Sequence, residues 1–253
     1  MKKILYLLPV ILCLTGCSLL QNVNWDSAQL QNAAGNALTA ITLTDAQIIE
    51  LSRQTIAQED AKHKIDNGSY ATRLKKVLAG ARVDGLTLDP KVYILNEVNA
   101  FACGDGSIRV YSGLMDIMTD DELLAVVGHE IGHVVNHDTR DAMKNAYLAA
   151  AARGLVNAAG SIGALSQSVI GDIGEAYFNS QYSQKQEYAA DKFGFQFTVA
   201  NGHDPYGMYN SLVKLMQLSG GESNASSLEK MFSSHPETAE RAKRVKEMAD
   251  KIK

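Results

Sequence analysis

The chain has 253 residues, with 24 Lys and Arg against 28 Asp and Glu, and its formal net charge is −4. A mildly acidic chain without a block of basic residues is not expected to bind nucleic acid. The length is enough for one sizeable hydrophobic core, and the sequence contains neither repeats nor signs of a second globular domain.

The first seventeen residues have the pattern of an export signal. Lys2 and Lys3 precede the apolar run 4–14, which is too short to span a bilayer as a stable anchor. The run ends in Leu14-Thr15-Gly16-Cys17, which resembles a bacterial lipobox, where a lipid is attached to the cysteine sulfur and the chain is cleaved before it. The alternative is an ordinary signal peptide or membrane anchor that happens to contain a cysteine.

If the lipobox is used, residues 1–16 are a signal peptide and Cys17 carries a lipid anchor. Ser18 after the cysteine favours the outer membrane, with the protein on its periplasmic side. Residues 17–43 are rich in Gln, Asn, Ala and Ser, and we expect a lipidated tether there. Cys103 would then be the only free thiol, which excludes an internal disulfide in the mature chain.

The segment after the tether is predicted to begin with two helices, over residues 44–63 and 69–81. A capping box at Thr44 opens the first of them. Gly85 and Asp89-Pro90 are typical of turns. Three strands follow, and we expect them at 92–95, 98–103 and 108–111, the last two joined by Gly104-Asp105-Gly106.

The remainder of the chain is predicted to be mostly helical. Thr119 and Glu122 form a second capping box, which opens a helix directly after the small sheet. The Ala- and Gly-rich run 141–179 is typical of paired helices or of a flexible helical lid. Residues 220–234 are expected to form a loop. Later helices are expected at 184–200, from Asp204 onward and from Pro236 onward.

The helix that begins after Thr119 carries the pentapeptide His129-Glu130-Ile131-Gly132-His133. Two histidines four positions apart lie on one face of a helix, so both imidazoles can reach one Zn²⁺ ion. Glu130 would then lie next to the metal-bound water, where a general base is needed. The alternative is a chance pair of surface histidines, which the apolar helix around them disfavours. The motif predicts metal-assisted hydrolysis, most often of a peptide bond.

Two glycines flank this motif at an unusual place. Gly128 and Gly132 lie one turn apart inside the predicted helix, where each costs roughly 1 kcal/mol relative to Ala. We therefore expect another backbone or a ligand to come close on that side of the helix.

A catalytic zinc site needs a third protein ligand and leaves its fourth position for water. His137 is a poor candidate because it lies about 12 Å from His129 along a continuous helix. A metzincin would need a histidine where Thr139 stands. Glu187 is the better candidate, with Asp191 on the same helical face as a partner for a ligand histidine. Spacing alone leaves Glu175 as a competitor, and any such pair can also be a solvated helix face.

The ordered set of motifs resembles peptidase family M48, a zinc metallopeptidase family of the gluzincin type. The set is the pentapeptide, then Glu187-X-X-Ala190-Asp191, then His235-Pro236 with Arg241. The resemblance covers roughly residue 44 to the C-terminus and is closest to its bacterial outer-membrane lipoprotein branch. It implies a mainly helical α+β, zincin-like domain over 44–253, with a small β-sheet beside the helix of the pentapeptide.

The resemblance also implies roles for individual residues. His129, His133 and Glu187 would be ligands of one Zn²⁺ per chain, Glu130 the catalytic base and Asp191 a support behind the ligands. His235 is our candidate for the group that stabilises the oxyanion, although by itself it resembles an exposed residue at a helix start. Arg241 could orient Glu187 or Asp191, or be only a surface charge.

Asn99, Ala100 and Phe101 resemble the start of the edge strand with which gluzincins bind substrate. An exposed edge offers unpaired N–H and C=O groups, so an extended peptide can add to it as a further strand. The alternative is a plain internal strand. Strand addition is mostly independent of sequence and suits a protease for unfolded chains.

Three functions are open on sequence grounds. The first is a zinc endopeptidase that degrades misfolded or unassembled envelope proteins. The second is a chaperone-like or assembly-factor lipoprotein whose metal site is gated shut, with envelope assembly machinery as a possible partner. The third is an exopeptidase. The sequence favours the first, because every residue that hydrolysis needs is present.

Overall fold

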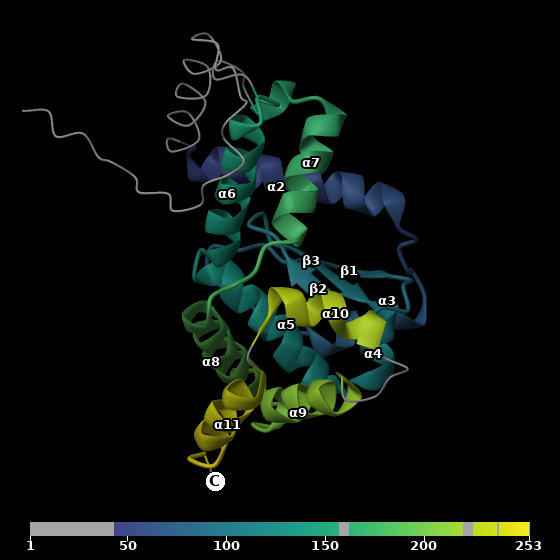
Figure 1. The fold of residues 1–253 in the computed structure, drawn as a ribbon. Helices are drawn as coiled ribbons and strands as arrows, with labels where there is room; N and C mark the ends of the chain where they lie inside the picture. The colour runs from purple at the N-terminus through teal and green to yellow at the C-terminus, as the bar shows by residue number, and fades with distance from the viewer. Residues whose placement is uncertain (1–42, 157–161, 220–224, 237, 253) are drawn as a thin grey trace, which may run out of the picture.

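The computed structural model describes residues 43–156, 162–219, 225–236 and 238–252. The predicted signal peptide, Cys17 and nearly all of the tether lie outside the described residues. The described helices surround one small sheet (Figure 1), as the sequence predicted. In chain order the elements are α2 Asp45–Lys62, α3 Ser69–Val77, β1 Asp89–Tyr93, β2 Ala100–Ala102, β3 Ser107–Tyr111, α4 Ser112–Ile117, α5 Asp120–Val135, α6 Asp138–Ala152, the 3₁₀ turn η1 Ile162–Ala164, α7 Gln167–Phe178, α8 Gln184–Ala200, α9 Gly207–Ser219, α10 Ala225–Ser234 and α11 Thr238–Ala249.

The sheet has the strand order β1-β3-β2, with β3 in the centre. β1 pairs with β3 in parallel, with Asp89 opposite Ser107, and β2 pairs with β3 antiparallel, with Phe101 opposite Arg109. Every residue of β3 is buried, as expected for a central strand covered on both faces. β2 is therefore an edge strand, as the sequence predicted for the segment after Asn99.

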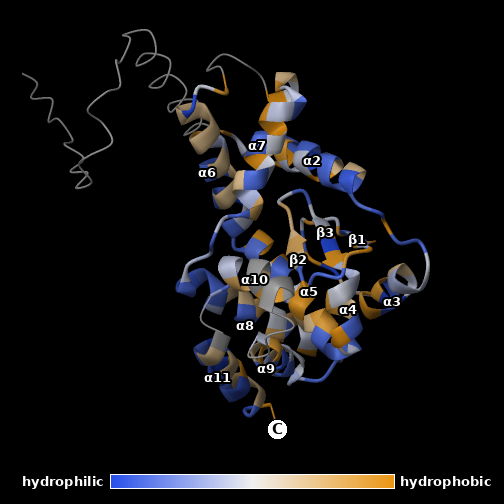
Figure 2. Ribbon diagram, turned by 45° about the vertical axis from the view of Figure 1, so that its right-hand side comes forward, coloured by the Kyte–Doolittle hydropathy of each residue, from blue (hydrophilic) through white to orange (hydrophobic). Residues whose placement is uncertain are grey.

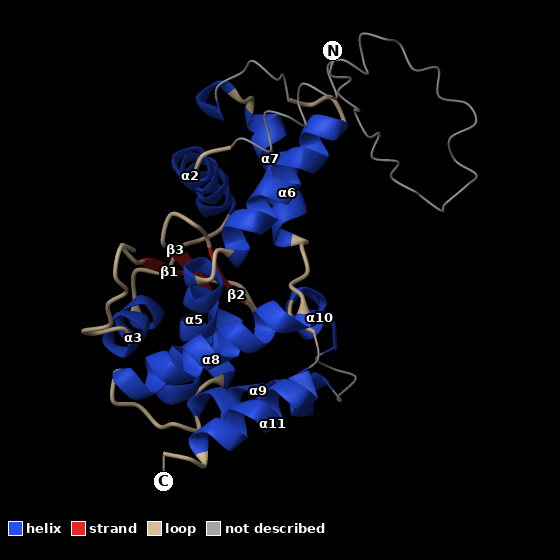
Figure 3. Cartoon of the chain, turned by 90° about the vertical axis from the view of Figure 1, so that its left-hand side faces the viewer, coloured by secondary structure: helices blue, strands red, loops and turns tan. Residues whose placement is uncertain are grey.

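The two faces of the sheet pack against different helices because successive side chains of a strand point to opposite sides. Ile108 and Val110 of β3 join a core with α3 and α5 on one face. Arg109 lies on the other face, where it contacts Asp60 of α2. The helices α2, α6 and α7 form a second core above this face, and Figure 3 shows them on one side of the sheet with α5 on the other.

α5 is the central helix of the molecule. Its capping box at Thr119 is formed as predicted, and nearly all of its residues are buried. α8 and α9 pack along it, and α11 packs against α8 and α9 (Figure 3). Hydrophobic residues dominate α5, whereas hydrophilic residues are frequent on the outer helices (Figure 2). Burial of α5 thus places the pentapeptide inside the protein.

Several predicted boundaries are wrong. Residues 220–234 were expected to be a loop, but α10 occupies 225–234, because Leu228 and Met231 are spaced for one helical face and bury it against the core. Asp89-Pro90 was expected to be a turn, but both residues belong to β1. An edge strand tolerates a proline, because the missing N–H can face away from the ladder.

Other differences are smaller. The strands predicted at 92–95 and 98–103 lie at 89–93 and 100–102, and the helix predicted over 69–81 ends at Val77. The Ala- and Gly-rich run contains α6 and α7, which pack against each other as paired helices rather than as a separate lid. In the described part of the chain, every helix is too short or too polar to cross a bilayer.

Candidate metal centre

The two histidines of the pentapeptide converge on the buried side of α5. The Nε2 atoms of His129 and His133 are 3.1 Å apart, and their rings are nearly perpendicular. One helical turn separates the residues, so the rigid helix fixes this geometry before any other element contributes. Both side chains are buried. The predicted convergence of the two imidazoles is confirmed.

Glu187 reaches the same point from α8. A capping box at Ser183 starts this helix, which places Glu187 in its first turn with no exposed surface. Its Oε1 atom lies 3.3 Å from the His133 Nε2 atom, and its Oε2 atom lies 3.6 Å from the His129 Nε2 atom. The competing Glu175 lies on α7, is exposed and is outside this cluster.

A seam of glycines explains how α8 comes so close to α5. A Cβ atom at Gly132 would lie 3.0 Å from the Cα atom of Ala190, and one at Gly128 would lie 2.9 Å from the Phe197 ring. Gly194 lies on the α8 side of the same contact, and a Cβ atom there would lie 2.9 Å from the backbone nitrogen of His129. The sequence-based expectation that another backbone approaches these glycines is confirmed, and that backbone is α8.

His235 completes the group of converging atoms. It follows α10, and its Nδ1 atom lies 2.9 Å from Glu187 Oε1 and 3.3 Å from His129 Nε2. One nitrogen or oxygen from each of His129, His133, Glu187 and His235 falls within a group whose atoms are all within 4.8 Å of one another. His235 Nε2 lies 3.8 Å from the carboxylate of Glu130. The structure therefore places His235 at the fourth corner of the cluster, beside the predicted base.

Carboxylates stand behind both histidines. The Nδ1 atom of His129 is 2.9 Å from Asp191, and that of His133 is 2.9 Å from Asp138. Because a carboxylate can only accept, each Nδ1 carries a proton, and each Nε2 atom is directed toward the centre of the cluster. Arg241 binds both oxygens of Asp191 and also contacts Glu187, so it is a buried partner of these carboxylates and not a surface charge.

The spacing of these atoms fits a metal ion. Ligand atoms arranged tetrahedrally at about 2.0–2.1 Å from zinc are about 3.3 Å apart. The two Nε2 atoms are 3.1 Å apart, and the carboxylate of Glu187 lies 3.3 Å from that of His133 through Oε1 and 3.6 Å from that of His129 through Oε2. Glu187 Oε2 is buried and accepts no hydrogen bond of normal geometry, although the Arg241 guanidinium touches it. Two imidazoles and a carboxylate are also a donor set typical of zinc. These residues could therefore hold such an ion.

Burial and neighbouring charges shift the protonation of the cluster. Burial lowers the pKa of His129 to about 4, so this ring is neutral at pH 7. Burial also raises the pKa of Glu187, but the positive charge and hydrogen bonds of His235 and His133 outweigh it, and the pKa is well below its usual range. The pKa of His133 is raised, because the hydrogen bond to Asp138 and the nearby Glu187 outweigh the effect of burial. An ionised carboxylate beside a neutral imidazole is what a cation requires.

Glu130 lies beside the cluster, at the meeting point of two cavities. Burial raises its pKa to about 7, which is the range in which a general base works best near neutral pH. One cavity is lined by apolar side chains of α5, α9 and α10, together with His129 and His235. The other is lined by the β2 segment, by residues 177–182 and again by His235.

The predicted substrate strand borders the second cavity. Asn99 is buried, and its carbonyl oxygen accepts the Tyr111 N–H of β3. Residues alternate in an antiparallel ladder, so Ala100 and Ala102 direct their N–H and C=O groups away from β3. Ala102 already accepts a hydrogen bond from the Tyr177 hydroxyl at 2.8 Å. Among the described residues, the backbone N–H and C=O groups of Ala100 therefore have no partner in the sheet, and Ala100 lines the same cavity as Glu130.

Sequence analysis missed two residues of this site. Asp138 begins α6, and it turns back toward His133 because His137 adopts a left-handed conformation with a φ of 64°. Tyr182 stacks on the His133 ring with 3.8 Å between ring centroids. The position of Asp138, five residues after His133, could have suggested a partner for that histidine. No pattern in the neighbouring sequence predicts a role for Tyr182. His137 itself is outside the cluster, as its spacing predicted.

Comparisons with known proteins agree with this geometry. Residues 66–249 match Peptidase family M48. The chain is 39% identical to "Metalloprotease LoiP" of Escherichia coli (strain K12), covering 100% of this chain and 99% of that protein. It is 36% identical to "Metalloprotease YcaL" of the same organism, covering 92% of this chain and 91% of that protein. It is also 26% identical to "Protease HtpX" of Legionella pneumophila (strain Lens), covering 63% of this chain and 70% of that protein. The chain therefore belongs to peptidase family M48, the zinc metallopeptidase family that its motifs predicted, and is a metalloprotease.

Proposed function

We propose that this metalloprotease is a zinc-dependent endopeptidase that hydrolyses misfolded or unassembled proteins of the bacterial envelope. The single observation that carries the proposal is the convergence of His129, His133 and Glu187 on one point, with Glu130 beside them. Bound zinc would lower the pKa of a water to about 7 and polarise the scissile carbonyl.

The side chains around the cluster support the steps of hydrolysis. Glu130 takes a proton from the attacking water and passes one to the leaving amine nitrogen. Burial makes this carboxylate easier to protonate than an exposed one, which supports a role in proton transfer. Asp191 and Asp138 keep His129 and His133 in the tautomer whose Nε2 atoms face the ion.

Two features of the cleft favour unfolded substrates. The backbone groups of Ala100 do not pair with β3, so an extended chain could add to this edge as a further strand. On the other side of Glu130 lies the apolar cavity, lined by Val126, Met208, Leu212, Leu215, Met231 and Phe232. A folded protein hides both extended backbone and apolar side chains, whereas a misfolded one exposes them. We therefore expect cleavage next to a large apolar residue in an extended segment.

The cellular setting of the proposal rests on the amino-terminal sequence. A lipid on Cys17 would tether the catalytic domain to the periplasmic face of the outer membrane. Membrane fractionation and globomycin treatment test this part by itself. A soluble mature form with a free amino terminus would reject the anchor and leave the catalytic proposal standing.

His235 favours a second candidate, in which the same site is gated. Its Nδ1 atom lies where the fourth ligand would be, 3.3 Å from His129 and 2.9 Å from Glu187. An ion held by four protein ligands has no position for water. A protein fixed in this arrangement would bind zinc and unfolded clients and cleave nothing, as a chaperone or assembly factor would. In the endopeptidase, His235 swings away from the ion and stabilises the oxyanion instead.

One experiment tests both candidates. Zinc content and cleavage of an unfolded protein such as casein are measured for the wild type, Glu130→Gln and His235→Ala. The endopeptidase predicts cleavage by the wild type and a loss of about 10²-fold to 10⁴-fold in Glu130→Gln with zinc retained. Full activity in Glu130→Gln would reject the mechanism. Release of single residues from short peptides would indicate an exopeptidase.

His235→Ala separates the two roles of that residue. If His235 stabilises the oxyanion, its removal lowers kcat by about 10²-fold to 10³-fold. If it only blocks the fourth position, its removal raises the cleavage rate above that of the wild type. A wild type that binds zinc and cleaves nothing until His235 is removed would establish the gated form.

A further inference from the structure

Tyr182 occupies an unusual position between the metal cluster and the substrate cavity. Its ring lies almost parallel to the His133 imidazole, with the planes 12° apart and the ring centroids 3.8 Å apart. It also lies 5.4 Å from the His235 ring and lines the cavity that contains Glu130. None of the motifs in the sequence includes it.

The chain holds Tyr182 firmly in this place. The next residue, Ser183, begins α8 with a complete capping box, so the helix that carries Glu187 also fixes the approach of Tyr182. The Tyr182 N–H donates to the carbonyl oxygen of Ser234 at 3.1 Å, which joins it to the end of α10 next to His235. Tyr182 is thus anchored on both sides by backbone contacts.

A chain of hydrogen bonds links His133 to Ser183, the residue that follows Tyr182. The His133 Nδ1–H donates to Asp138, and the other oxygen of Asp138 accepts from the side chain of Gln186 at 2.9 Å. Gln186 in turn completes the capping box with Ser183. The hydrogen bond and the stacked ring therefore reach His133 from one connected piece of structure.

The hydrogen bond to Asp138 and the stacked ring restrain different motions of His133. A hydrogen bond at Nδ1 fixes one direction within the imidazole plane but leaves the ring free to tilt about that direction. A parallel ring at van der Waals distance prevents this tilt, because tilting would press one edge of the imidazole into Tyr182. Both restraints together are needed to aim the Nε2 lone pair at one point.

We propose that Tyr182 is a positioning residue, whose aromatic ring fixes the plane of the His133 imidazole and thereby strengthens metal binding. The proposal rests on the proposed function only in that the ligands hold an ion. The ring carries the effect, because the contact with His133 is ring to ring.

The test compares ring-retaining and ring-removing substitutions in the purified full-length protein. Zinc dissociation constants are measured by competition with a chelator for the wild type, Tyr182→Phe and Tyr182→Leu. Tyr188→Leu is the matched control, since Tyr188 lies six residues later and its ring faces Arg244 at 4.1 Å instead of a ligand. The visible spectrum of the Co²⁺-substituted protein reports the ligand geometry without any cleavage assay.

We expect Tyr182→Leu to weaken zinc binding by about 10-fold to 100-fold, as loss of other supports behind metal ligands does, and to change the Co²⁺ spectrum. Tyr182→Phe and Tyr188→Leu should stay close to the wild type in both measurements. If Tyr182→Leu does not fold without metal, Tyr182→Met provides the same comparison with a flexible side chain.

Two outcomes would overturn the proposal. One is wild-type zinc affinity and an unchanged spectrum in Tyr182→Leu. The other is a loss in Tyr182→Phe as large as in Tyr182→Leu, which would assign the effect to the hydroxyl group. A wild type that binds zinc but cleaves nothing would reject the endopeptidase, and the affinity series would still decide the role of Tyr182.

Discussion

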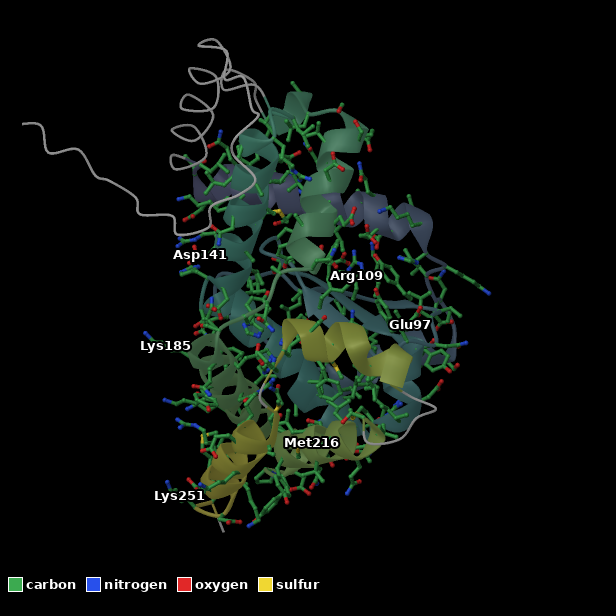
Figure 4. All side chains as sticks on the ribbon, viewed as in Figure 1. Glu97, Arg109, Asp141, Lys185, Met216 and Lys251 are labelled. Atoms are coloured by element: carbon green, nitrogen blue, oxygen red, sulfur yellow. The ribbon has the colours of Figure 1, made fainter. Side chains whose placement is uncertain are left out.

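Two clusters of charged side chains in the described part of the chain each involve a buried arginine, and their charges are satisfied in different ways. The first, which we call the sheet cluster, consists of Asp60, Asp89, Lys91, Tyr93 and Arg109. Arg109 is 1% exposed and forms two hydrogen bonds to the carboxylate of Asp60, at 2.7 and 3.0 Å. Figure 4 labels Arg109 between the strands and the helices above them. In this cluster donors meet acceptors directly.

The metal cluster of His129, His133, Glu187 and His235 is arranged differently. Its nitrogen and oxygen atoms converge on one region: Glu187 Oε1 lies within hydrogen-bond distance of His235, whereas Oε2 contacts the Arg241 guanidinium without a hydrogen bond of normal geometry. A cation among these atoms would be favourable, because it would provide a partner for the buried Oε2 atom. The sheet cluster therefore stabilises the fold by itself, whereas the metal cluster has a set of donor atoms that could hold an ion.

The largest expected effect is that of removing Arg241, the cation that balances Asp191 and Glu187. Breaking a buried ion pair typically costs about 3–5 kcal/mol. We expect Arg241→Met to lose about this much unfolding free energy in chelator, and less in excess zinc, because the ion then balances Glu187. Urea unfolding with and without zinc measures both values.

Arg244→Met is the matched control for Arg241→Met. Arg244 lies one turn later on α11 and is exposed, with its guanidinium over the Tyr188 ring. Its replacement should cost well under 1 kcal/mol. Equal losses in the two variants would contradict the view that the metal cluster needs a compensating cation.

A smaller effect is expected from closing the space between α5 and α8. A Cβ atom at Gly194 would lie 2.9 Å from the Ala125 oxygen and the His129 nitrogen, which are backbone atoms that cannot move aside. We expect Gly194→Ala to cost up to about 3 kcal/mol and to weaken zinc binding, because α8 carries Glu187. The sheet cluster should be unaffected. Thermal unfolding and zinc titration measure the two effects.

Gly171→Ala in α7 is the control for this substitution. The nearest atom to a Cβ at Gly171 is the Gln58 side-chain oxygen at 3.5 Å, an ordinary contact. Alanine should stabilise that helix by up to about 1 kcal/mol. A neutral Gly194→Ala variant with normal zinc affinity would show that the helix seam does not set the ligand distances.

The smallest expected effect concerns the sheet cluster and depends on pH. Burial raises the pKa of Asp60, but hydrogen bonds from Arg109, Lys91 and Tyr93 outweigh it and lower the pKa from 3.8 to about 2. A lowered folded-state pKa gives stability that is complete above the unfolded-state value and is lost as the pH falls toward 2. This shift corresponds to about 2 kcal/mol.

At pH 6, the unfolding free energy of Asp60→Asn should therefore be lower than that of the wild type. This difference in unfolding free energy should shrink by about 2 kcal/mol as the pH falls from about 4 toward 2. Unfolding free energies at several pH values, measured in chelator and in zinc, test this. The exposed Asp84 offers a control through Asp84→Asn. If the loss of unfolding free energy in Asp60→Asn depended on zinc, the sheet cluster would not be independent of the metal cluster.

Local signals in the sequence predicted much of the fold correctly. The capping boxes at Thr44 and Thr119 are both formed, because their hydrogen bonds join residues only three positions apart. The convergence of His129 and His133 was equally predictable, since helix geometry alone determines it. Weaker local signals failed: the helix α10 and the strand position of Pro90 depend on packing partners far away in the chain.

The sequence by itself determined the family, the metal motif on α5 and the close approach of a partner helix at Gly128 and Gly132. Spacing alone left Glu175 as a competitor of Glu187, which the family resemblance favoured. The tertiary structure gave the physical reason, because α8, and not α7, packs against that glycine face. It also brought Asp138, Tyr182 and His235 to the cluster. Those contacts involve turns and chain crossings whose geometry no local pattern encodes, since they form only when α5, α6, α8 and α10 pack together.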